Sequence, residues 1–96
     1  RLIAVAVTED ATYLDPMLSG EGIDGIDAMV AAAQPQFAGA VLRRTGDIGS
    51  HPDRIRFTWD AIGADGEPDI AGIDFCVVAP DGRLQSITGF FDLVPE

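Results

Sequence analysis

The chain has 96 residues, enough for one domain with a single core. Sixteen acidic residues stand against six arginines and no lysine, and the resulting formal charge of -10 would repel nucleic-acid phosphates and anionic lipid surfaces. Hydrophobic residues make up 47% of the chain, but no apolar run approaches the roughly 20 residues that cross a bilayer. We therefore expect a soluble, globular, single-domain protein with no nucleic-acid or membrane partner.

Cysteine and histidine occur once each, as Cys76 and His51. A single cysteine cannot form an intrachain disulfide, and one residue of each type leaves no cluster for a structural zinc site. The glycines at 20, 22 and 25 are not followed by the Lys-Ser/Thr pair of a phosphate-binding loop. The sequence therefore indicates neither a metal nor an organic cofactor, and it suits a reducing, cytoplasmic compartment.

The first part of the chain predicts a helix end and a short strand. Residues 1–9, "RLIAVAVTE", are apolar at nearly every position and suit either the end of a buried helix or a strand, and we favour the helix. Because the chain begins without an initiator methionine, we expect further residues upstream, including an N-terminal helix. The stretch "ATYLDP" predicts a strand ending at Asp15, since Pro16 biases the preceding residue toward extended geometry.

A helix over 24–34 is predicted next, because apolar residues recur there at helical spacing, with Asp24 as the N-cap and an end near Pro35. Beyond it the apolar pattern changes to a period of two. This predicts four strands joined by turns, at 40–48, 54–62, 70–79 and 83–94. Since each connection can be a hairpin, we expect an α+β fold with a mostly antiparallel sheet and helices gathered on one face.

The strand over 70–79 carries a carboxylate, Asp74, although both of its faces are apolar. Burying an ionised carboxylate is costly unless it is paired. Two explanations stay open: Asp74 takes up a proton, with a raised pKa, or it pairs with an arginine and serves structure only. The arginines that neighbouring strands could supply are Arg43, Arg44, Arg54 and Arg56.

Asp15 is a second candidate site residue. An acid fixed before a proline at a strand end, close to the glycine-rich entry to a helix, lies where a cavity mouth can form. The alternative is a turn-forming Asp-Pro pair with no further role. His51 in the polar turn "SHPD" and Cys76 in an apolar strand are interpreted as a loop histidine and a core cysteine.

The order of these elements, with "TEDATYLDP", then "GIDGIDAMVAAA", then "AGIDFCVVAPDGRLQSITGFFD", resembles the NTF2-like superfamily and within it the SnoaL-like branch. The resemblance covers essentially the whole chain. It implies an NTF2-like cone, in which a strongly curved sheet wraps around helices and leaves a pocket between them. It also implies a homodimer through the outer sheet face, which would explain why the strand over 70–79 is apolar on both sides.

Two motifs are similar to those of the ketosteroid isomerases in this superfamily. "ATYLDP" resembles the motif of their catalytic base, and "GIDF" resembles that of their oxyanion-hole acid, from which the match runs without a gap to Phe91. The resemblance implies that Asp15 removes a proton alpha to a carbonyl while protonated Asp74 donates to the enolate oxygen. The tyrosine that completes the oxyanion hole in those enzymes lies upstream of this chain's first residue, and Tyr13 is on the wrong element to replace it.

The resemblance leaves two classes of function open. One is an isomerase or polyketide cyclase acting on a hydrophobic, carbonyl-bearing small molecule. The epoxide-hydrolase chemistry of other members is disfavoured, because their last-strand acid falls at Gly89. The other class is a noncatalytic ligand-binding or dimerisation module in which Asp74 pairs with an arginine. Under the first reading, the apolar pocket lining is predicted to come from Met29, Val30, Phe57, Trp59 and Phe90.

Overall fold

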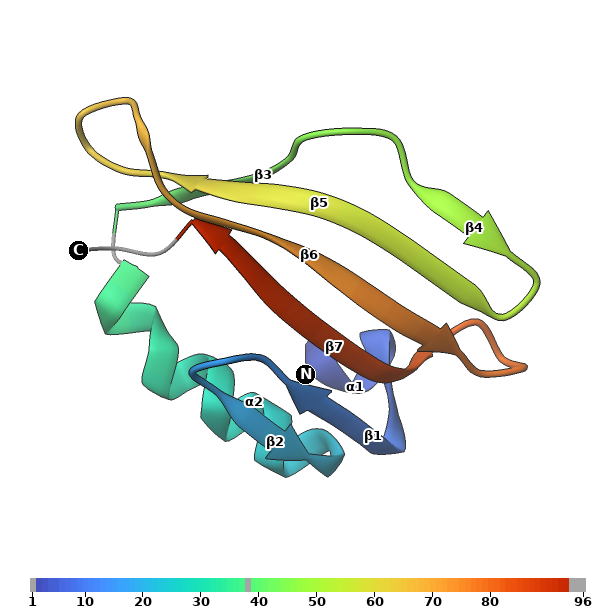
Figure 1. Cartoon of the computed structure of the whole chain (residues 1–96). Helices are drawn as coiled ribbons and strands as arrows, with labels where there is room; N and C mark the ends of the chain where they lie inside the picture. The colour runs from blue at the N-terminus through green and yellow to red at the C-terminus, as the bar shows by residue number, and fades with distance from the viewer. Residues whose placement is uncertain (1, 38, 94–96) are drawn as a thin grey trace.

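The computed structural model describes residues 2–37 and 39–93, which form a seven-stranded sheet and two α-helices, an α+β fold as predicted (Figure 1). The elements, in chain order, are α1 (Leu2–Ala6), β1 (Val7–Leu14), β2 (Ser19–Glu21), α2 (Gly22–Ala33), the 3₁₀ helix η1 (Gln34–Phe37), β3 (Val41–Arg44), β4 (Gly49–His51), β5 (Arg54–Ile62), β6 (Pro68–Val78) and β7 (Leu84–Leu93).

The strand order is β2-β1-β7-β6-β5-β3, and β4 pairs with β5 beyond the end of β3. Every pair is antiparallel except that of β1 and β7, which are parallel with Tyr13 opposite Ile87. The three long strands β5, β6 and β7 form a strongly twisted meander (Figure 1). Because β1 lies beside β7, the end of the first strand reaches the middle of the last one.

Helix α2 covers one face of the sheet at its β1 end (Figure 1). Ile26 packs there against Val7 and Ala11 of β1, and these three buried residues form the centre of the core. The apolar side chains of α2 recur every three or four residues, so a single face of the helix meets the sheet. Half-buried residues complete this cluster: Tyr13, Ile23, Met29, Val30, Leu84 and Ile87.

The first helix is confirmed but ends earlier than residue 9, at Ala6. Its end is set by β1, which begins at Val7 and pairs with β7 from that residue on. Arg83, in the turn between β6 and β7, donates hydrogen bonds to the carbonyl oxygens of Ala4 and Val7 at 3.2 and 3.3 Å. The β6–β7 turn therefore holds the junction between α1 and β1.

The boundaries of α2 differ from the prediction at its start. The helix begins at Gly22, the N-cap position belongs to Glu21, and Asp24 lies inside the first turn, so the N-cap prediction was wrong. The α-helix ends at Ala33, close to the predicted stop near Pro35. Among the described residues, no helix has the length and apolar character needed to cross a bilayer.

The strands were predicted best where period-two alternation is strongest. β5 has the predicted bounds, and β6 differs from its prediction by only two residues at the start and one at the end. The single strand predicted over 40–48 was wrong, because β3 and β4 are separate strands that each pair with β5. β2 was missed, since three residues in a glycine- and acid-rich stretch carry no alternation.

Candidate functional site

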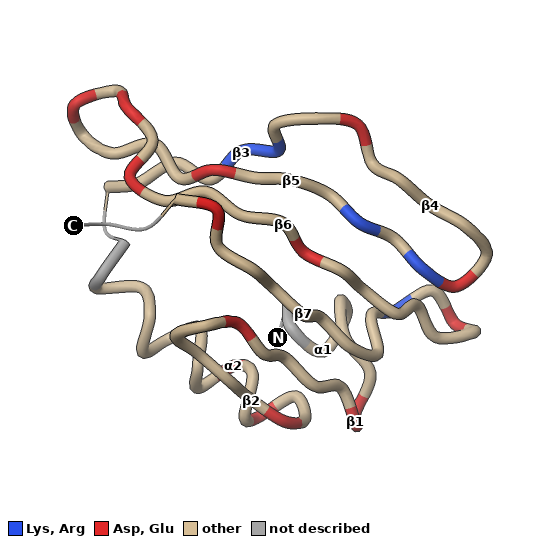
Figure 2. The backbone as a smooth tube through the Cα atoms, in the orientation of Figure 1, with Lys and Arg blue, Asp and Glu red and all other residues tan. Residues whose placement is uncertain are grey.

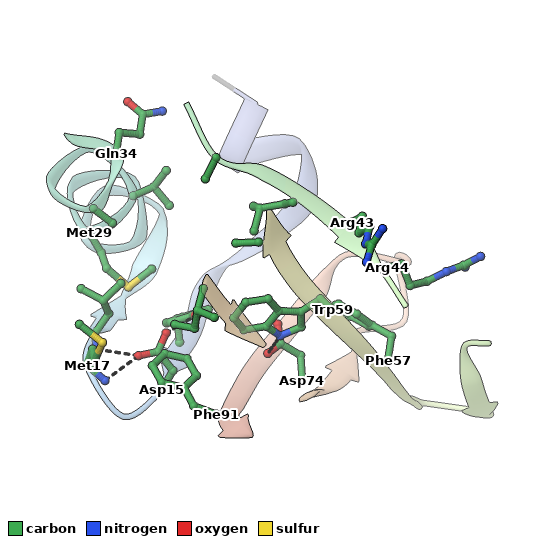
Figure 3. Close-up of a pocket in the computed structure, with 18 residues that line it drawn as sticks. Asp15, Met17, Met29, Gln34, Arg43, Arg44, Phe57, Trp59, Asp74 and Phe91 are labelled. Atoms are coloured by element: carbon green, nitrogen blue, oxygen red, sulfur yellow. Dashed lines mark hydrogen bonds between the residues drawn. The ribbon is translucent and has the colours of Figure 1, made fainter. Parts of the chain in front are cut away.

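A cavity of about 610 Å³ lies between α2 and the face of the sheet formed by β5, β6 and β7 (Figure 3). Most of its lining is apolar, and the polar side chains are few and placed on different elements. In Figure 3, Asp15 and Asp74 lie on one side of the cavity, and Arg43 and Arg44 lie on β3, away from the two acids. The larger apolar residues of the lining are Met17, Leu18, Met29, Val30, Leu42, Phe57, Trp59, Ile70 and Phe91.

Asp15 follows the last residue of β1 and is only 8% exposed. Its Oδ1 accepts hydrogen bonds from the backbone N–H groups of Met17 and Leu18 at 2.8 and 2.7 Å. Its Oδ2 accepts one from the Tyr13 hydroxyl at 2.6 Å. The Asp-Pro pair does form a turn, and in doing so it directs two backbone donors at a carboxylate that lines the cavity. Three donors thus converge on the two oxygens of this buried side chain.

Asp74 lies in the middle of β6 and lines the same cavity. The indole Nε1 of Trp59 donates a hydrogen bond to Oδ1 of Asp74 over 3.0 Å. Burial raises the pKa of the Asp74 carboxyl above its ordinary value, the Trp59 hydrogen bond opposes this rise, and the negative charge of Asp15 adds to it. The two acids of the cavity therefore have different environments, with many donors around Asp15 and an apolar, singly bonded site for Asp74.

Gly89 brings the two acids together. It lies opposite Asp74 in the pairing of β6 with β7, on the cavity face of the sheet. A Cβ atom at this position would lie 2.9 Å from Oδ1 of Asp74 and 3.2 Å from the Cβ of Asp15. Both acidic side chains thus occupy the space above Gly89, and only a residue without a side chain leaves that space free.

Two further groups next to the acids stay neutral. Burial, followed by the hydrogen bond to Asp15, raises the pKa of the Tyr13 phenol above its ordinary value, so the hydroxyl remains a donor. Burial and the nearby charge of Asp74 raise the pKa of Cys76 to about 11. A thiol with so high a pKa is a poor nucleophile, which agrees with the interpretation of Cys76 as a core residue.

Arg43, one of the four arginines considered as a partner for Asp74, pairs with a different acid. Arg43 forms a two-pronged ion pair with Asp60, with Nε to Oδ1 at 2.8 Å and Nη2 to Oδ2 at 3.0 Å. Arg54 pairs with Asp53 and Arg83 with its neighbour in the turn. Within residues 2–37 and 39–93, no arginine forms an ion pair with Asp74, so the structural alternative for this residue does not hold there.

Four of the five predicted lining residues line the cavity: Met29 and Val30 from α2, and Phe57 and Trp59 from β5. The fifth prediction, Phe90, was wrong. The register of β6 with β7 pairs Gly89 with Asp74, so Phe90 points to the opposite face, where its ring meets that of Phe75 edge to face. Phe91, the next residue, lines the cavity and makes an edge contact with Trp59 at a centroid distance of 6.0 Å.

Tyr13 and Gly89, which contact the acids, are among the site residues that the sequence interpretation did not assign to the site. Tyr13 stands two positions before Asp15, and residues two apart on a strand share a face, so this partnership had a signal in the sequence. The described part of the chain holds no group of three or more His, Cys, Asp or Glu side chains that could bind a metal ion.

No protein-family model matches the chain, and no curated protein gives a significant match. Among solved structures, a candidate isomerase of the SnoaL-like family from Agrobacterium tumefaciens is 35% identical, with 95% of this chain and 78% of that chain covered and a TM-score of 0.90. A candidate SnoaL-like polyketide cyclase from Jannaschia sp. is 14% identical over 95% of this chain and 70% of its own, with a TM-score of 0.76.

An NTF2-like protein of unknown function from Exiguobacterium sp. is 21% identical over 95% of this chain and 80% of its own, with a TM-score of 0.76. At 14% and 21% identity these last two proteins share the fold with this chain. The Agrobacterium protein adds sequence similarity over most of both chains. On that similarity, the chain belongs to the SnoaL-like family and has the NTF2-like fold.

Proposed function

We propose that the cavity binds a hydrophobic, carbonyl-bearing small molecule and that Asp15 and Asp74 promote proton transfer at the carbon next to its carbonyl group. The reaction would be of the isomerase or polyketide-cyclase type, and it would need no cofactor. The observation that carries the proposal is the convergence of the two acids above Gly89 in a largely apolar cavity. A pair of acids whose environments differ in this way suits one base and one acid.

In this reaction Asp15 is the base. Its Oδ1 accepts two backbone N–H groups and its Oδ2 accepts only the Tyr13 hydroxyl, so a lone pair remains on Oδ2. The carboxylate would take the proton from the carbon next to the carbonyl, and the electrons of that C–H bond would form the enolate. The neutral Tyr13 hydroxyl holds Asp15 in place throughout.

Asp74 is the acid. Its raised pKa favours the protonated form, which can donate a hydrogen bond to the enolate oxygen as negative charge develops there. In an isomerase, the proton on Asp15 is then returned to another carbon of the enolate. In a cyclase, the enolate carbon attacks a second carbonyl of the same molecule, and the alkoxide formed there takes the proton from Asp15. The aromatic side chains of Phe57, Trp59 and Phe91 in the cavity lining suit an apolar substrate.

The test is exchange of deuterium into a panel of steroid enones and aromatic polyketide-like 1,3-diketones, followed by NMR or mass spectrometry. We expect Asp15→Asn to lower the exchange rate by about 10²- to 10⁴-fold, the usual contribution of a general base, while ligand binding persists. Glu9→Gln is the matched control, because Glu9 is an exposed acid on the same strand. If the wild-type protein exchanges no proton with any compound of the panel, the proposed function is wrong.

The alternative is a ligand-binding or dimerisation module without catalysis. This alternative would be supported by an ion pair between Asp74 and an arginine and by a cavity too small for a ligand. In the described residues Asp74 is bound by Trp59, and the cavity of about 610 Å³ is within the range of small-molecule sites. Tight binding of a panel compound with neither exchange nor turnover would support this alternative.

A further inference from the structure

Trp59 is placed by its neighbours so that its indole N–H meets Asp74. It lies opposite Gly72 in the pairing of β5 with β6, two residues before the acid along β6. A Cβ at Gly72 would lie 2.9 Å from Cζ2 and 3.2 Å from Cε2 of the indole, so the ring lies directly over this glycine. Phe91 meets the ring edge to face from β7. The glycine and the phenylalanine together fix the direction of the N–H bond.

The hydrogen bond distinguishes the two oxygens of Asp74. The indole is a donor only, so Oδ1, at 3.0 Å from Nε1, must accept. No described residue forms a hydrogen bond with Oδ2, and the described side chains include no buried polar atom without a partner. Oδ2 is therefore accessible, and since Asp74 lines the cavity, it is the oxygen available to a ligand.

We propose that Trp59 is a positioning residue for the acid: by occupying Oδ1 of Asp74 as an acceptor, it keeps the acidic proton on Oδ2, where that proton can be donated to a ligand oxygen in the cavity. The inference rests on the proposed role of Asp74 as a donor. In a protonated carboxyl group the carbonyl oxygen is the better acceptor, so the indole N–H selects Oδ1 as the carbonyl oxygen and leaves the O–H at Oδ2.

This role differs from apolar lining in a way that can be measured. The indole bond stabilises the charged form of Asp74 and so works against its protonation. Removing the N–H should therefore leave Asp74 protonated to higher pH and yet make the reaction slower, because the remaining acid is no longer oriented. Substitution of a residue that only lines the cavity should not both raise the pKa of Asp74 and slow the reaction.

The first experiment uses the wild-type protein and needs no substrate. The chain has one tryptophan, so ¹⁵N labelling gives a single indole N–H signal. We expect this signal to shift in one step with pH, at a midpoint above the ordinary Asp value of about 3.9, and the step to vanish in Asp74→Asn but persist in Asp15→Asn. If the chemical shift of the indole N–H does not change as Asp74 titrates, the proposal is wrong.

The second experiment compares Trp59→Phe with Phe57→Leu, a matched change of another aromatic cavity residue on the same strand. For Trp59→Phe we expect kcat for exchange to fall about tenfold with little change in KM, as for a misplaced catalytic group. ¹³C NMR should show the Asp74 carboxyl titrating at higher pH than in the wild type. Phe57→Leu should act mainly on KM and leave that titration in place.

The outcomes separate the two proposals. If the wild type exchanges protons and Trp59→Phe behaves like Phe57→Leu, the positioning role is wrong while the proposed function stands. If the wild type shows no exchange with any compound, the proposed function fails, and the NMR titration still decides whether Trp59 holds Oδ1 of Asp74. If Trp59→Phe does not fold, that same titration of the wild-type protein and of Asp74→Asn is the deciding measurement.

Discussion

Asp15 and Asp74 share the space above Gly89, although one follows the first strand and the other lies in the middle of β6. The parallel pairing of β1 with β7 brings Asp15 to this point, and the antiparallel pairing of β6 with β7 brings Asp74. The distance between the two acids is therefore set by β7, which carries no acid on the cavity face at this position.

Gly89→Ala should separate the two acids. The new Cβ would be 2.9 Å from Oδ1 of Asp74 and 3.2 Å from the Cβ of Asp15, so both acidic side chains would have to shift. We expect the exchange rate to fall about a hundredfold, because small displacements of catalytic groups are costly. The free energy of unfolding should fall by about 1–3 kcal/mol, as for other overpacked sites, and urea titration measures it.

Gly25→Ala is the control for that substitution. Gly25 lies inside α2, and a Cβ there would meet nothing closer than 3.9 Å. Alanine should stabilise the helix by about 0.5–1 kcal/mol and leave exchange unchanged. A Gly89→Ala variant that kept full exchange activity would contradict the placement of the site between the two acids.

Tyr13→Phe should expose how strongly the hydroxyl holds Asp15. The bond of 2.6 Å links a neutral phenol to a buried carboxylate, and hydrogen bonds to charged groups contribute about 1.5–3 kcal/mol. We expect the free energy of unfolding to fall by about that amount at pH 7. A double-mutant cycle with Asp15→Asn isolates the pair, and a coupling energy near zero would show that the two side chains act independently.

Asp74→Asn should stabilise the protein at neutral pH. The pKa of Asp74 is raised in the folded state by burial, so below the unfolded value of about 3.9 the wild type and the variant should be equally stable. As pH rises past that value the unfolded chain ionises first, and the wild type loses stability until the folded carboxyl also ionises. The difference is about 1.4 kcal/mol for each unit between the two pKa values.

Urea unfolding of both proteins between pH 3 and pH 8 measures this difference. Other titrating groups are common to the two proteins, so their contributions cancel. A wild type that gains stability relative to Asp74→Asn as pH rises would mean that the carboxylate, and not the acid, is the form that the fold favours. The proposed donor role of Asp74 would then be lost as well.

We propose that two copies of the chain associate through the outer face of the sheet. Phe75 and Phe90 are 44% and 53% exposed there and meet edge to face, on the side of the sheet opposite the cavity. Arg56 of β5 lies opposite Phe75 in the pairing of β5 with β6. Figure 2 shows the arginines of β5 in a chain whose charged residues are mostly acidic. Exposed apolar clusters of this kind mark interfaces.

Sedimentation of the wild type should therefore give a dimer at micromolar concentration, and Phe90→Glu should give a monomer. Val5→Glu is the control, because Val5 is also an exposed apolar residue but lies on α1 and not on the sheet. A wild type that sediments as a monomer at this concentration would refute the association.

The sequence predicted the faces of the strands but not their register. In β5 the alternation placed Phe57 and Trp59 on one face, and both line the cavity. Local patterns can do this because successive side chains on a strand point to opposite faces. They also located the Asp-Pro turn, because proline restricts the backbone of the residue before it.

Register depends on contacts that no local pattern records. β6 and β7 have an irregularity between Val77 and Val78, where the pairing shifts by one residue. If the pairing of Val78 with Leu84 simply continued along the hairpin, Phe90 would face Gly72 and line the cavity. The bulge puts Phe91 there instead, because a shift of one residue moves every side chain to the other face. Neither phenylalanine differs in any property that the sequence displays.

The parallel pairing of β1 with β7 has a consequence for how activity and folding are connected. Thr12 lies opposite Ser86, so nearly the whole chain forms a loop that must close before this pair exists. Closing so long a loop is entropically costly and tends to come late in folding. The candidate base is held at the end of that pair and the candidate acid one strand beyond it. A chain that has not yet added its last strand, whether during synthesis or after proteolysis, would therefore lack the strand that brings the two acids together.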